Sequence, residues 1–576
     1  MTTQKRASLA ILLLLSGLTA CIGEEAGELP NAELADEVYE EGPPFITKNG
    51  KSDIFDQDLA AYGPLPKGMR YDLAIQAVFA PDDPVATLEM HMIDRVRDAR
   101  RADATVYGAG ENPYRIRYAV YNLRNPDLLD RLVDAHKAGV DVRVLIEAAQ
   151  IDPDKPWNIA DKVLVDNGFT LFADHRKMTD ADKQKSATLV GIKSGGLMHL
   201  KTRIYDTPEG SHLLTGSLNP GDNAVLNEES LHLISDARII ERYREMYDNV
   251  LYGRPIANKW EGDKALNVLF TPTKTGVRAG TQILRWIEEE QEQILIMVFS
   301  LRELTADNID GSLVDILAQK VKDGVPVYVI TDRKQSDGID ADGNRIMWDD
   351  VTEDKLRRAG VPVYEAVNYA TPFCAMHFKA AVLGKTRIRV ITDAANWTLA
   401  GLGGKGRATK NVESVLFIDS ARLDDNLTGR RYLAQWTRVL SRYAHQSVEI
   451  DREKSFDAVY ERLSSAANWP SQPVSFGASH AETAFGESIK VIGDRPELGA
   501  WGNGHNGVAL TTDAASYPRW SSLGPVLMPL GAQFEWKFVA QHQNTLRWEP
   551  GENRQGIAQP SALTGAADAH YTDAWR

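Results

Sequence analysis

Apolar and polar positions follow two different rhythms along this chain. From about residue 72 to residue 445, short apolar runs rich in β-branched residues alternate with segments of helical periodicity. This alternation of strands and amphipathic helices predicts an α/β architecture. After about residue 473 the chain changes to short strands separated by turns, which predicts an all-β sandwich of roughly a hundred residues.

The α/β region contains the same pattern twice. The first copy reads AVYNLRNPDLLDRLVDAHKAGVDVRVLIEAAQ, and the second reads MVFSLRE followed by SLVDILAQKVKDGVPVYVITDRK. Each is a strand, an amphipathic helix, a Gly-Val pair and a second strand, and the openings QAVFAPDD and NVLFTPTK also correspond. The repeat predicts two pseudo-symmetric lobes within one chain.

These patterns predict the domain organisation. We expect short linkers around 253–262 and 446–473, where neither strand nor helix patterning continues. The expected parts are a signal peptide over 1–20, an acidic tether over 21–70, lobe one over 71–254, lobe two over 263–446 and the sandwich over 472–562.

The N-terminus predicts export and lipidation. Lys5 and Arg6 precede an apolar run that is too short to span a membrane. The following LTAC, which ends at Cys21, resembles the bacterial lipobox, whose cysteine is acylated; an ordinary signal peptide that ends near a cysteine is the alternative. We therefore expect a lipoprotein on the periplasmic or extracellular face of a bacterial cell envelope such as the outer membrane.

Composition narrows the class of protein. The chain has 576 residues, of which 43% are hydrophobic and 25% charged, and its formal net charge is -15. Such an acidic chain is unlike proteins that coat nucleic acid through broad basic surfaces. Its two cysteines, Cys21 and Cys374, cannot build a disulfide framework or a cysteine zinc site.

Matching polar motifs occur in both lobes. Lobe one contains MHLKTRIYD, TGSLN and NEES; lobe two contains MHFKAAVLG, TDAANWT and NVES. In an H-x-K strand the His and Lys side chains project to the same face, since side chains alternate. Pseudo-two-fold symmetry would gather both clusters around one anion. The candidate residues are His199, Lys201, Asp206, Ser217, Asn219 and Glu229 in lobe one, and His377, Lys379, Asn396 and Glu413 in lobe two.

These residue types suit cleavage of a phosphodiester. A neutral histidine can attack phosphorus and form a covalent intermediate, while a second protonates the leaving oxygen and then activates water. Lysines and asparagine amides can hold the charged oxygens, so the chemistry needs no metal or other cofactor. A carboxylate can fix the histidine tautomer.

The motif MHLKTRIYD with TGSLN resembles the H-x-K-x4-D motif of the phospholipase D superfamily, over both lobes. The resemblance implies that His199 is the nucleophile and His377 the general acid and base. It further implies that Lys201, Lys379, Asn219 and Asn396 bind phosphate, and that Glu229 and Glu413 support the histidines.

Lobe two departs from the family pattern. Gly384 stands where the family has Asp, and Asp393-Ala394 stand where it often has Gly-Ser. The lost serine hydroxyl removes a hydrogen-bond donor near the phosphate, and the carboxylate of Asp393 would oppose anion binding unless it points away. A weakened or inactive enzyme is therefore an alternative to an intact one.

The sandwich is rich in aromatic residues. Flat indole faces stack on sugar rings, although the alternating aromatics around Trp536 predict a core position for that residue. The run IKVIGDRPELGAWG … YPRW … FEWKFV … LRWEPGENR resembles the family-20 carbohydrate-binding module, the starch-binding domain of amylases. This resemblance implies one glucan platform of Trp501, Lys537, Trp548 and Asn553, and a second site at Tyr517 and Trp520.

Three functions remain open from the sequence. The first is a phospholipase D or phosphatidyltransferase that acts on phospholipids and is targeted to a starch-like glucan. The second is a nuclease-like phosphodiesterase, which the acidic charge disfavours. The third is a glucan-binding lipoprotein with a decayed phospholipase D site.

Overall fold

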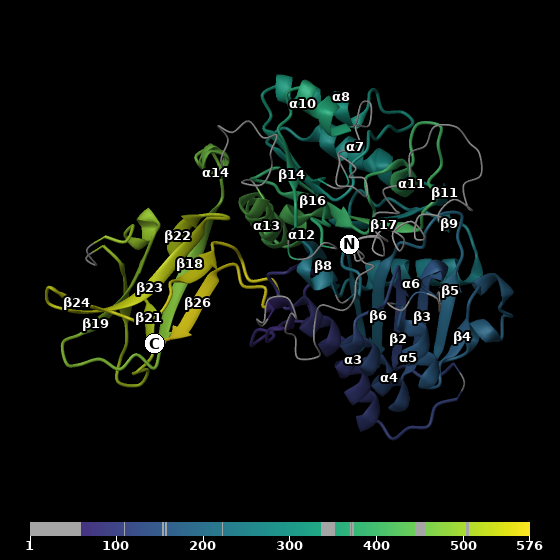
Figure 1. The fold of residues 1–576 in the computed structure, drawn as a ribbon, viewed down its shortest axis with the longest axis horizontal. Helices are drawn as coiled ribbons and strands as arrows, with labels where there is room; N and C mark the ends of the chain where they lie inside the picture. The colour runs from purple at the N-terminus through teal and green to yellow at the C-terminus, as the bar shows by residue number, and fades with distance from the viewer. Residues whose placement is uncertain are drawn as a thin grey trace, which may run out of the picture.

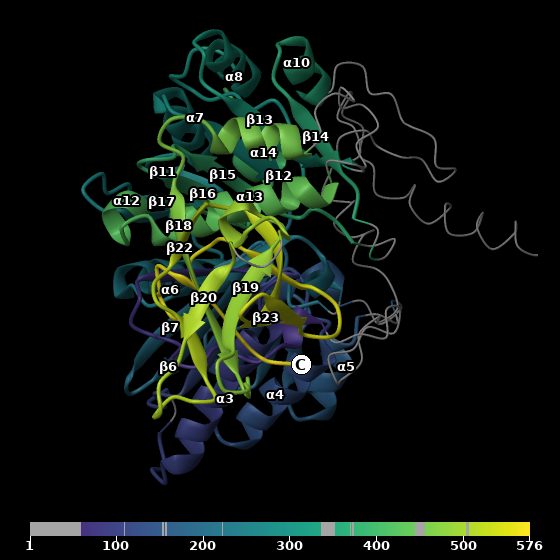
Figure 2. The same ribbon diagram turned by 90° about the vertical axis from the view of Figure 1, so that its left-hand side faces the viewer.

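The computed structural model describes residues 59–576, except for 109, 152–154, 156–157, 222, 334, 336–351, 369, 371–373, 444–455 and 503–505. Two α/β lobes lie one above the other, and a β module lies to one side of them (Figure 1). In the perpendicular view the module lies in front of the lobes (Figure 2). The predicted fold class, two α/β lobes and a β module, is confirmed.

Lobe one is built on an eight-stranded mixed sheet in the order β1-β8-β7-β6-β2-β3-β5-β4. Its strands are β1 (Ile75–Ala80), β2 (Arg115–Val120), β3 (Asp141–Glu147), β4 (Thr170–Phe172), β5 (Thr188–Ile192), β6 (Lys201–Thr207), β7 (Gly210–Gly216) and β8 (Glu229–Ile234). Its helices are α3 (Val85–Ala102), α4 (Pro126–Lys137), α5 (Ala160–Asp166) and α6 (Ala237–Tyr252), with 3-10 turns η2 (Ala60–Tyr62), η3 (Ala148–Gln150), η4 (His175–Lys177), η5 (Asp182–Gln184) and η6 (Ala224–Leu226).

Lobe two repeats this plan on a seven-stranded sheet in the order β10-β17-β16-β15-β12-β13-β14. Its strands are β10 (Leu266–Thr271), β12 (Ile294–Val298), β13 (Val327–Asp332), β14 (Val363–Ala366), β15 (Lys379–Leu383), β16 (Arg389–Asp393) and β17 (Glu413–Asp419). Its helices are α7 (Ala279–Glu289), α8 (Leu313–Lys322), α10 (Thr352–Arg358), α11 (Leu399–Leu402), α12 (Ser420–Leu423) and α13 (Leu427–Tyr443). The short strands β9 (Ile256–Ala257) and β11 (Thr273–Thr275) pair beside the lobe junction.

Local sequence explains where the repeated helices begin. The side chain of Asn125 accepts from the backbone N–H of Asp127 and Leu128, and Pro126 occupies the first turn of α4. The matching helix α8 begins at a capping box formed by Ser312 and Asp315. The repeated helix therefore begins at a side-chain N-cap in both lobes.

One hydrophobic core joins the two lobes and reaches the module. It contains Ile204 of β6 and Tyr243 of α6 from lobe one, and Phe378 and Trp436 from lobe two, together with Leu530 of the module. Burial of apolar surface is the main favourable term in folding, so this shared core holds the two lobes together as one folded unit.

The module is a β sandwich in the strand order β22-β18-β21-β20-β19-β23-β24, with β25 added to β23 and β26 to β18. Its strands are β18 (Ser471–Ser479), β19 (Ser488–Gly493), β20 (Val508–Thr511), β21 (Trp520–Ser522), β22 (Val526–Pro529), β23 (Gln533–His542), β24 (Thr545–Trp548), β25 (Arg554–Ile557) and β26 (Ala569–Ala574), with the turn η7 (Pro496–Leu498). It docks on α13, where Thr437 Oγ1 donates to Gly531 O at 3.3 Å and Ser441 Oγ donates to Gln533 Oε1 at 3.1 Å.

The structure revises three predicted boundaries. The end of the predicted tether is folded, because Leu59 and Ala61 are buried in the lobe-one core. The segment predicted as a linker before the module contains helix α14 (Phe456–Ser464). The sandwich extends past residue 562, because β26 pairs with β18 in a parallel register. No local sequence pattern predicted this pairing.

Candidate active site

The two H-x-K motifs meet at the boundary between the lobes, and each is held by the other lobe. Residues that precede β6 and β15 form parallel bridges with residues that precede β17 and β8, Met198 with Val412 and Met376 with Glu228. The backbone N–H of His199 donates to Val412 O at 2.9 Å, and that of His377 donates to Glu228 O at 3.0 Å. The lobe boundary therefore runs through the candidate site.

The histidine–carboxylate pairs cross this boundary. Nδ1 of His199 lies 2.9 Å from Oε2 of Glu413, and Nδ1 of His377 lies 2.7 Å from Oε1 of Glu229. All four side chains are almost fully buried. Since an ionised carboxylate can only accept a hydrogen bond, each Nδ1 carries a hydrogen and leaves Nε2 for chemistry.

Two asparagines, which sequence reasoning missed, support these glutamates. Asn227 Nδ2 donates to Glu229 Oε1 at 3.2 Å, and its Oδ1 accepts from Ala375 N of lobe two at 3.0 Å. In the same way, Asn411 Nδ2 donates to Glu413 Oε1 at 3.4 Å. Its Oδ1 accepts from Leu197 N of lobe one at 3.0 Å. The sequence did contain a signal for these asparagines, because the same Asn-x-Glu-Ser pattern occurs in both lobes.

A carboxylate at the end of a parallel strand holds the backbone before each histidine, and it too was missed. Met198 N donates to Glu147 Oε2 at 2.7 Å, and Met376 N donates to Asp332 Oδ2 at 3.0 Å. Glu147 ends β3 and Asp332 ends β13, at matching positions of the repeat. The two sheets therefore place their H-x-K motifs by the same contact.

The motif lysines lie beside their histidines. Nζ of Lys201 donates to His199 O at 3.1 Å, and Nζ of Lys379 donates to His377 O at 2.9 Å. An aromatic ring meets each imidazole edge-on, Tyr121 in lobe one at 5.3 Å between ring centroids and its counterpart Phe299 in lobe two at 4.6 Å. Each lysine is thus buried beside the histidine of its own motif.

The structure also buries Ser217, Asn219 and Asn396 next to this centre. Each asparagine follows the end of β7 or β16, where two successive backbone N–H groups bond one serine carbonyl, Ser230 O or Ser414 O. Ser217 Oγ accepts from Ser230 N at 2.9 Å, so the hydroxyl also holds its own turn.

Asp206 is not part of the cluster, which corrects the prediction that it is catalytic. It lies five residues after Lys201 on β6 and therefore on the opposite face, roughly 16 Å further along the strand. Its carboxylate accepts a hydrogen bond from Arg244 of α6, which also donates to Ser211 Oγ. Asp206 thus anchors a helix to the far end of the strand.

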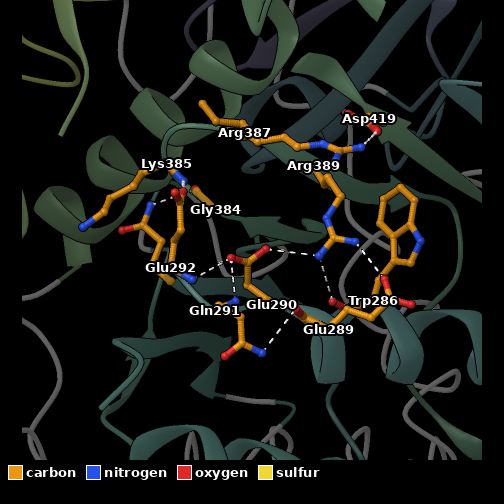
Figure 3. Close-up of polar contacts among 12 residues, drawn as sticks. Trp286, Glu289, Glu290, Gln291, Glu292, Gly384, Lys385, Arg387, Arg389 and Asp419 are labelled. Atoms are coloured by element: carbon orange, nitrogen blue, oxygen red, sulfur yellow. Dashed lines mark hydrogen bonds and ion pairs between the residues drawn. The ribbon is translucent and has the colours of Figure 1, made fainter. Parts of the chain in front are cut away.

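Gly384, where the family pattern has Asp, is equally remote from the histidines. It follows the end of β15 with φ of +82°, and a Cβ there would lie 2.4 Å from Arg387 O. Glu292 instead accepts from Lys385 N at 2.7 Å and Thr386 N at 2.8 Å, next to the ion pair of Arg387 with Asp419 (Figure 3). The missing carboxylate therefore removes nothing from the candidate site.

The carboxylate of Asp393 points into lobe one. Its carboxylate accepts hydrogen bonds from Thr215 Oγ1 at 2.9 Å and from Tyr243 OH at 2.5 Å, both in lobe one. Burial raises the pKa of Asp393 to about 6, although these hydrogen bonds and the charge of Lys201 lower it. Ala394 is buried and offers no hydroxyl where lobe one has Ser217.

The module presents an aromatic pair on its surface. Trp501 and Trp548 have ring centroids 6.4 Å apart at an interplanar angle of 46°, and Trp548 is 41% exposed. Near them Lys537 Nζ donates to Gly551 O at 2.5 Å, and Asn553 Nδ2 donates to Glu535 Oε2 at 2.8 Å.

The remaining module aromatics divide between core and surface. Trp536 is buried in the sandwich core, as its strand pattern predicted. Trp520 is buried as well, and its Nε1 donates to Ala481 O at 3.1 Å, which corrects its assignment to a second glucan platform. Tyr517 is 45% exposed and accepts from Thr483 N through its hydroxyl at 3.1 Å.

The predicted lipidation site, Cys21, lies outside the described residues, while Cys374 is buried. Within the described ranges, no helix is both long and apolar enough to cross a membrane. The same ranges contain no group of three or more His, Cys, Asp or Glu residues arranged to hold a metal ion.

Two family models match the chain. The model described as "Cardiolipin synthase, PLD-like domain" matches residues 111–251 and 283–430, which together make up half of the chain. The model described as "Starch binding domain" matches residues 471–565.

Curated relatives match about a sixth of the chain. An alpha-amylase of Thermomonospora curvata is 38% identical over 96 residues, which are 16% of this chain and 15% of the amylase. A cyclomaltodextrin glucanotransferase of Thermoanaerobacterium thermosulfurigenes is 32% identical over 99 residues, 17% of this chain and 14% of the enzyme. The chain thus spans about one seventh of the length of these relatives.

Two solved structures match shares of the chain. The phospholipase D family member Nuc from Salmonella typhimurium has a TM-score of 0.22 at 18% identity and covers 30% of this chain and 92% of its own. The family 20 module of a maltotetraose-forming amylase from Pseudomonas saccharophila has a TM-score of 0.15 at 31% identity and covers 18% of this chain and 98% of its own.

Proposed function

Because this chain belongs to the family of phospholipase D-like domains and carries a starch-binding module, we propose that it cleaves phospholipid phosphodiesters through a phosphohistidine intermediate. The observation that carries the proposal is the crosswise arrangement of the two buried histidines. His199 and His377 each have Nδ1 held by a glutamate, which directs both Nε2 atoms toward chemistry.

The first step forms the covalent intermediate. His199 Nε2 attacks phosphorus, a P–N bond forms, and the bond from phosphorus to the leaving oxygen breaks. The imidazolium of His377 gives its Nε2 proton to that oxygen, which departs as an alcohol. Glu413 stabilises the positive charge that develops on His199.

The second step returns the enzyme to its starting state. The now neutral His377 takes a proton from water, the water oxygen attacks phosphorus, and the P–N bond breaks. The products are a phosphomonoester and the original imidazole of His199. An alcohol in place of water gives phosphatidyl transfer, and the same residues serve both outcomes.

Charge on the phosphoryl oxygens is held by the buried cations and amides. Lys201 and Lys379 supply the ammonium groups, and Asn219 and Asn396 supply amide donors at the ends of β7 and β16. In a buried site such donors stabilise developing charge more strongly than water does, because they are already oriented.

A phospholipid substrate suits the predicted lipid anchor, which would hold the enzyme against a bilayer of the cell envelope. Nucleic acid is disfavoured by the net charge of -15, since duplex binding relies on many phosphate contacts to Lys and Arg. Two observations support an active site despite the departures in lobe two: Gly384 lies at the far end of β15, and the Asp393 carboxylate accepts hydrogen bonds from lobe one. The hydroxyl that Ala394 lacks has no replacement among these contacts.

A substrate panel tests this proposal. We expect the full-length protein, with EDTA present, to hydrolyse phosphatidylcholine vesicles and a chromogenic phosphodiester, with headgroup release as the readout. Cleavage of a single-stranded oligonucleotide at a higher kcat/KM than the vesicles would favour the nuclease-like function instead. No turnover of any substrate by folded protein would contradict the proposal.

The module is proposed to bind a starch-like glucan through Trp501 and Trp548. Stacking of sugar rings on exposed indoles makes such residues dominate binding energy, so the double Trp501→Ala/Trp548→Ala variant should lose roughly tenfold or more in affinity. Retention on insoluble starch and β-cyclodextrin titration measure the loss. Leu527→Ala, which removes a 62% exposed side chain elsewhere on the module, should bind as the wild type does. Equal retention of the double variant would contradict the assignment.

A further inference from the structure

Asp393 occupies a backbone position that disfavours any residue except glycine. Its φ is +112°, and the matching residue in lobe one is Gly216, where a Cβ would lie 2.1 Å from Ser230 O. A bulky or polar side chain at positive φ costs conformational energy and persists where the surrounding structure holds it, commonly at functional sites. The turn alone therefore does not explain why an aspartate, and not a glycine, occupies this position.

The carboxylate of Asp393 crosses from lobe two into lobe one. It is fully buried and takes hydrogen bonds from Thr215 at the end of β7 and Tyr243 of α6. The pseudo-symmetric pair is Thr392 and Tyr432, whose hydroxyl oxygens lie 2.8 Å apart. In place of a carboxylate, Nε2 of the neutral His232 imidazole lies 2.6 Å from the Tyr432 hydroxyl. Burial lowers the pKa of His232 to about 4, so the two halves of this boundary differ by one negative charge.

This charge lies at the level of the phosphate-binding lysines. β16 ends at Asp393, and its register with β15, Ala381 opposite Ile391, continues to Lys379. β7 runs beside β6 in the register Arg203 opposite Leu214, which continues toward Lys201. The Lys201 ammonium lowers the pKa of Asp393, as expected for a nearby opposite charge.

We propose that Asp393 is a specificity-determining residue: its buried negative charge beneath Lys201 and Lys379 makes the phosphate site favour a singly charged phosphodiester over a doubly charged phosphomonoester. This inference rests on the proposed function and deepens it. Asp393 does not touch the substrate and acts through the potential that it sets at the two lysines.

The physical argument is the dependence of Coulomb energy on the product of charges. A fixed negative charge opposes a dianion twice as strongly as a monoanion at the same place, so the fold-change for the dianion is the square of that for the monoanion. Hydrolysis converts a diester into a monoester that gains a second charge. The same carboxylate that tolerates the substrate therefore weakens binding of the product and favours its release.

The proposal has a defined pH dependence. The groups that face Asp393 are Thr215 of β7, Tyr243 of α6, Ser414 of β17, Lys201 of β6 and Tyr432 of α13, and the tyrosines stay neutral because burial raises their pKa. Above pH 6 the carboxylate is charged and the discrimination is present. As the pH falls through about 6, the carboxylate gains a proton and the discrimination is lost.

Binding of two unreactive anions to the full-length protein tests this. Inorganic phosphate at pH 8 is the dianion probe and dimethyl phosphate is the monoanion probe, each titrated by calorimetry. Asp393→Asn should tighten phosphate about tenfold and dimethyl phosphate about threefold. Asp393→Gly, which restores the lobe-one residue and relieves the backbone, should do the same. The matched control is Asp419→Asn, a buried aspartate six residues beyond Glu413 at the far end of β17, and it should change neither.

The outcomes separate this inference from the proposed function. Equal affinities in wild type and both Asp393 variants, or equal fold-changes for the two anions, would overturn the role of Asp393. Selective tightening of phosphate over dimethyl phosphate in both Asp393 variants at pH 8, where phosphate is mainly the dianion, would support it. If the wild type shows this selectivity but turns over no phosphodiester, the proposed function alone is contradicted. If the wild type binds neither anion, both the proposed function and the role of Asp393 are contradicted.

Discussion

Replacement of His199 by alanine should abolish phosphodiester turnover, with a loss of about 10⁴-fold or more in kcat, because a covalent mechanism cannot proceed without its nucleophile. His377→Ala should also be severe with an alcohol leaving group, which needs a proton to depart. The measurement is release of choline from phosphatidylcholine vesicles. His212, a half-buried histidine on the β6–β7 hairpin far from the site, provides the control, and His212→Ala should keep full activity.

A good leaving group separates the two histidine roles. p-Nitrophenolate departs without a proton, so His377→Ala should still form the intermediate from a p-nitrophenyl diester and then accumulate it. The expected readout is a burst of one p-nitrophenol per enzyme together with acid-labile phosphorus on the protein, and His199→Ala should show neither. A burst in His199→Ala and none in His377→Ala would reverse the assignment. No phosphoprotein from any variant would contradict the mechanism.

Glu413→Gln should impair the histidine of the other lobe, with a loss of roughly 10²–10⁴-fold in kcat. A glutamine amide can donate to Nδ1, which would favour the tautomer with hydrogen on Nε2 and thereby block attack by His199. Glu229→Gln should act in the same way on His377, whose Nδ1 lies 2.7 Å from that carboxylate. Because both pairs cross the lobe boundary, each glutamate variant should resemble the loss of the histidine in the opposite lobe.

Burst kinetics again give the decisive measurement. Glu413→Gln should suppress formation of the phosphohistidine, while Glu229→Gln should permit formation and slow its hydrolysis. The opposite pattern would show that each glutamate serves its own lobe. Glu353, buried on α10 away from both histidine pairs, offers a matched control, and Glu353→Gln should leave the burst unchanged.

Strand geometry explains which predicted site residues the structure keeps and which it removes. His199 and Lys201 are two residues apart and project together, so a local motif was enough to pair them. Asp206 is five residues from Lys201, and the odd spacing alone places it on the other face. Its counterpart Gly384 is remote for the same reason, so neither tells whether the site is active.

The sequence by itself determined the features that repeat or alternate locally. The duplicated α/β pattern, the two H-x-K motifs, the change to a sandwich near residue 473 and the core position of Trp536 all follow from periodicity or from recognisable motifs. Each depends on residues close together in the chain, whose relative placement is set by strand and helix geometry.

Only the tertiary structure decided how distant parts meet. The pairing of His199 with Glu413 joins residues 214 positions apart, and it depends on how two sheets dock through one shared apolar core. The direction of the Asp393 carboxylate, the burial of Trp520 and the addition of β26 to the sandwich have the same origin. Periodicity along the chain shows which face of an element is buried, but the partner on that face is selected by the sum of many packing contacts across the whole fold.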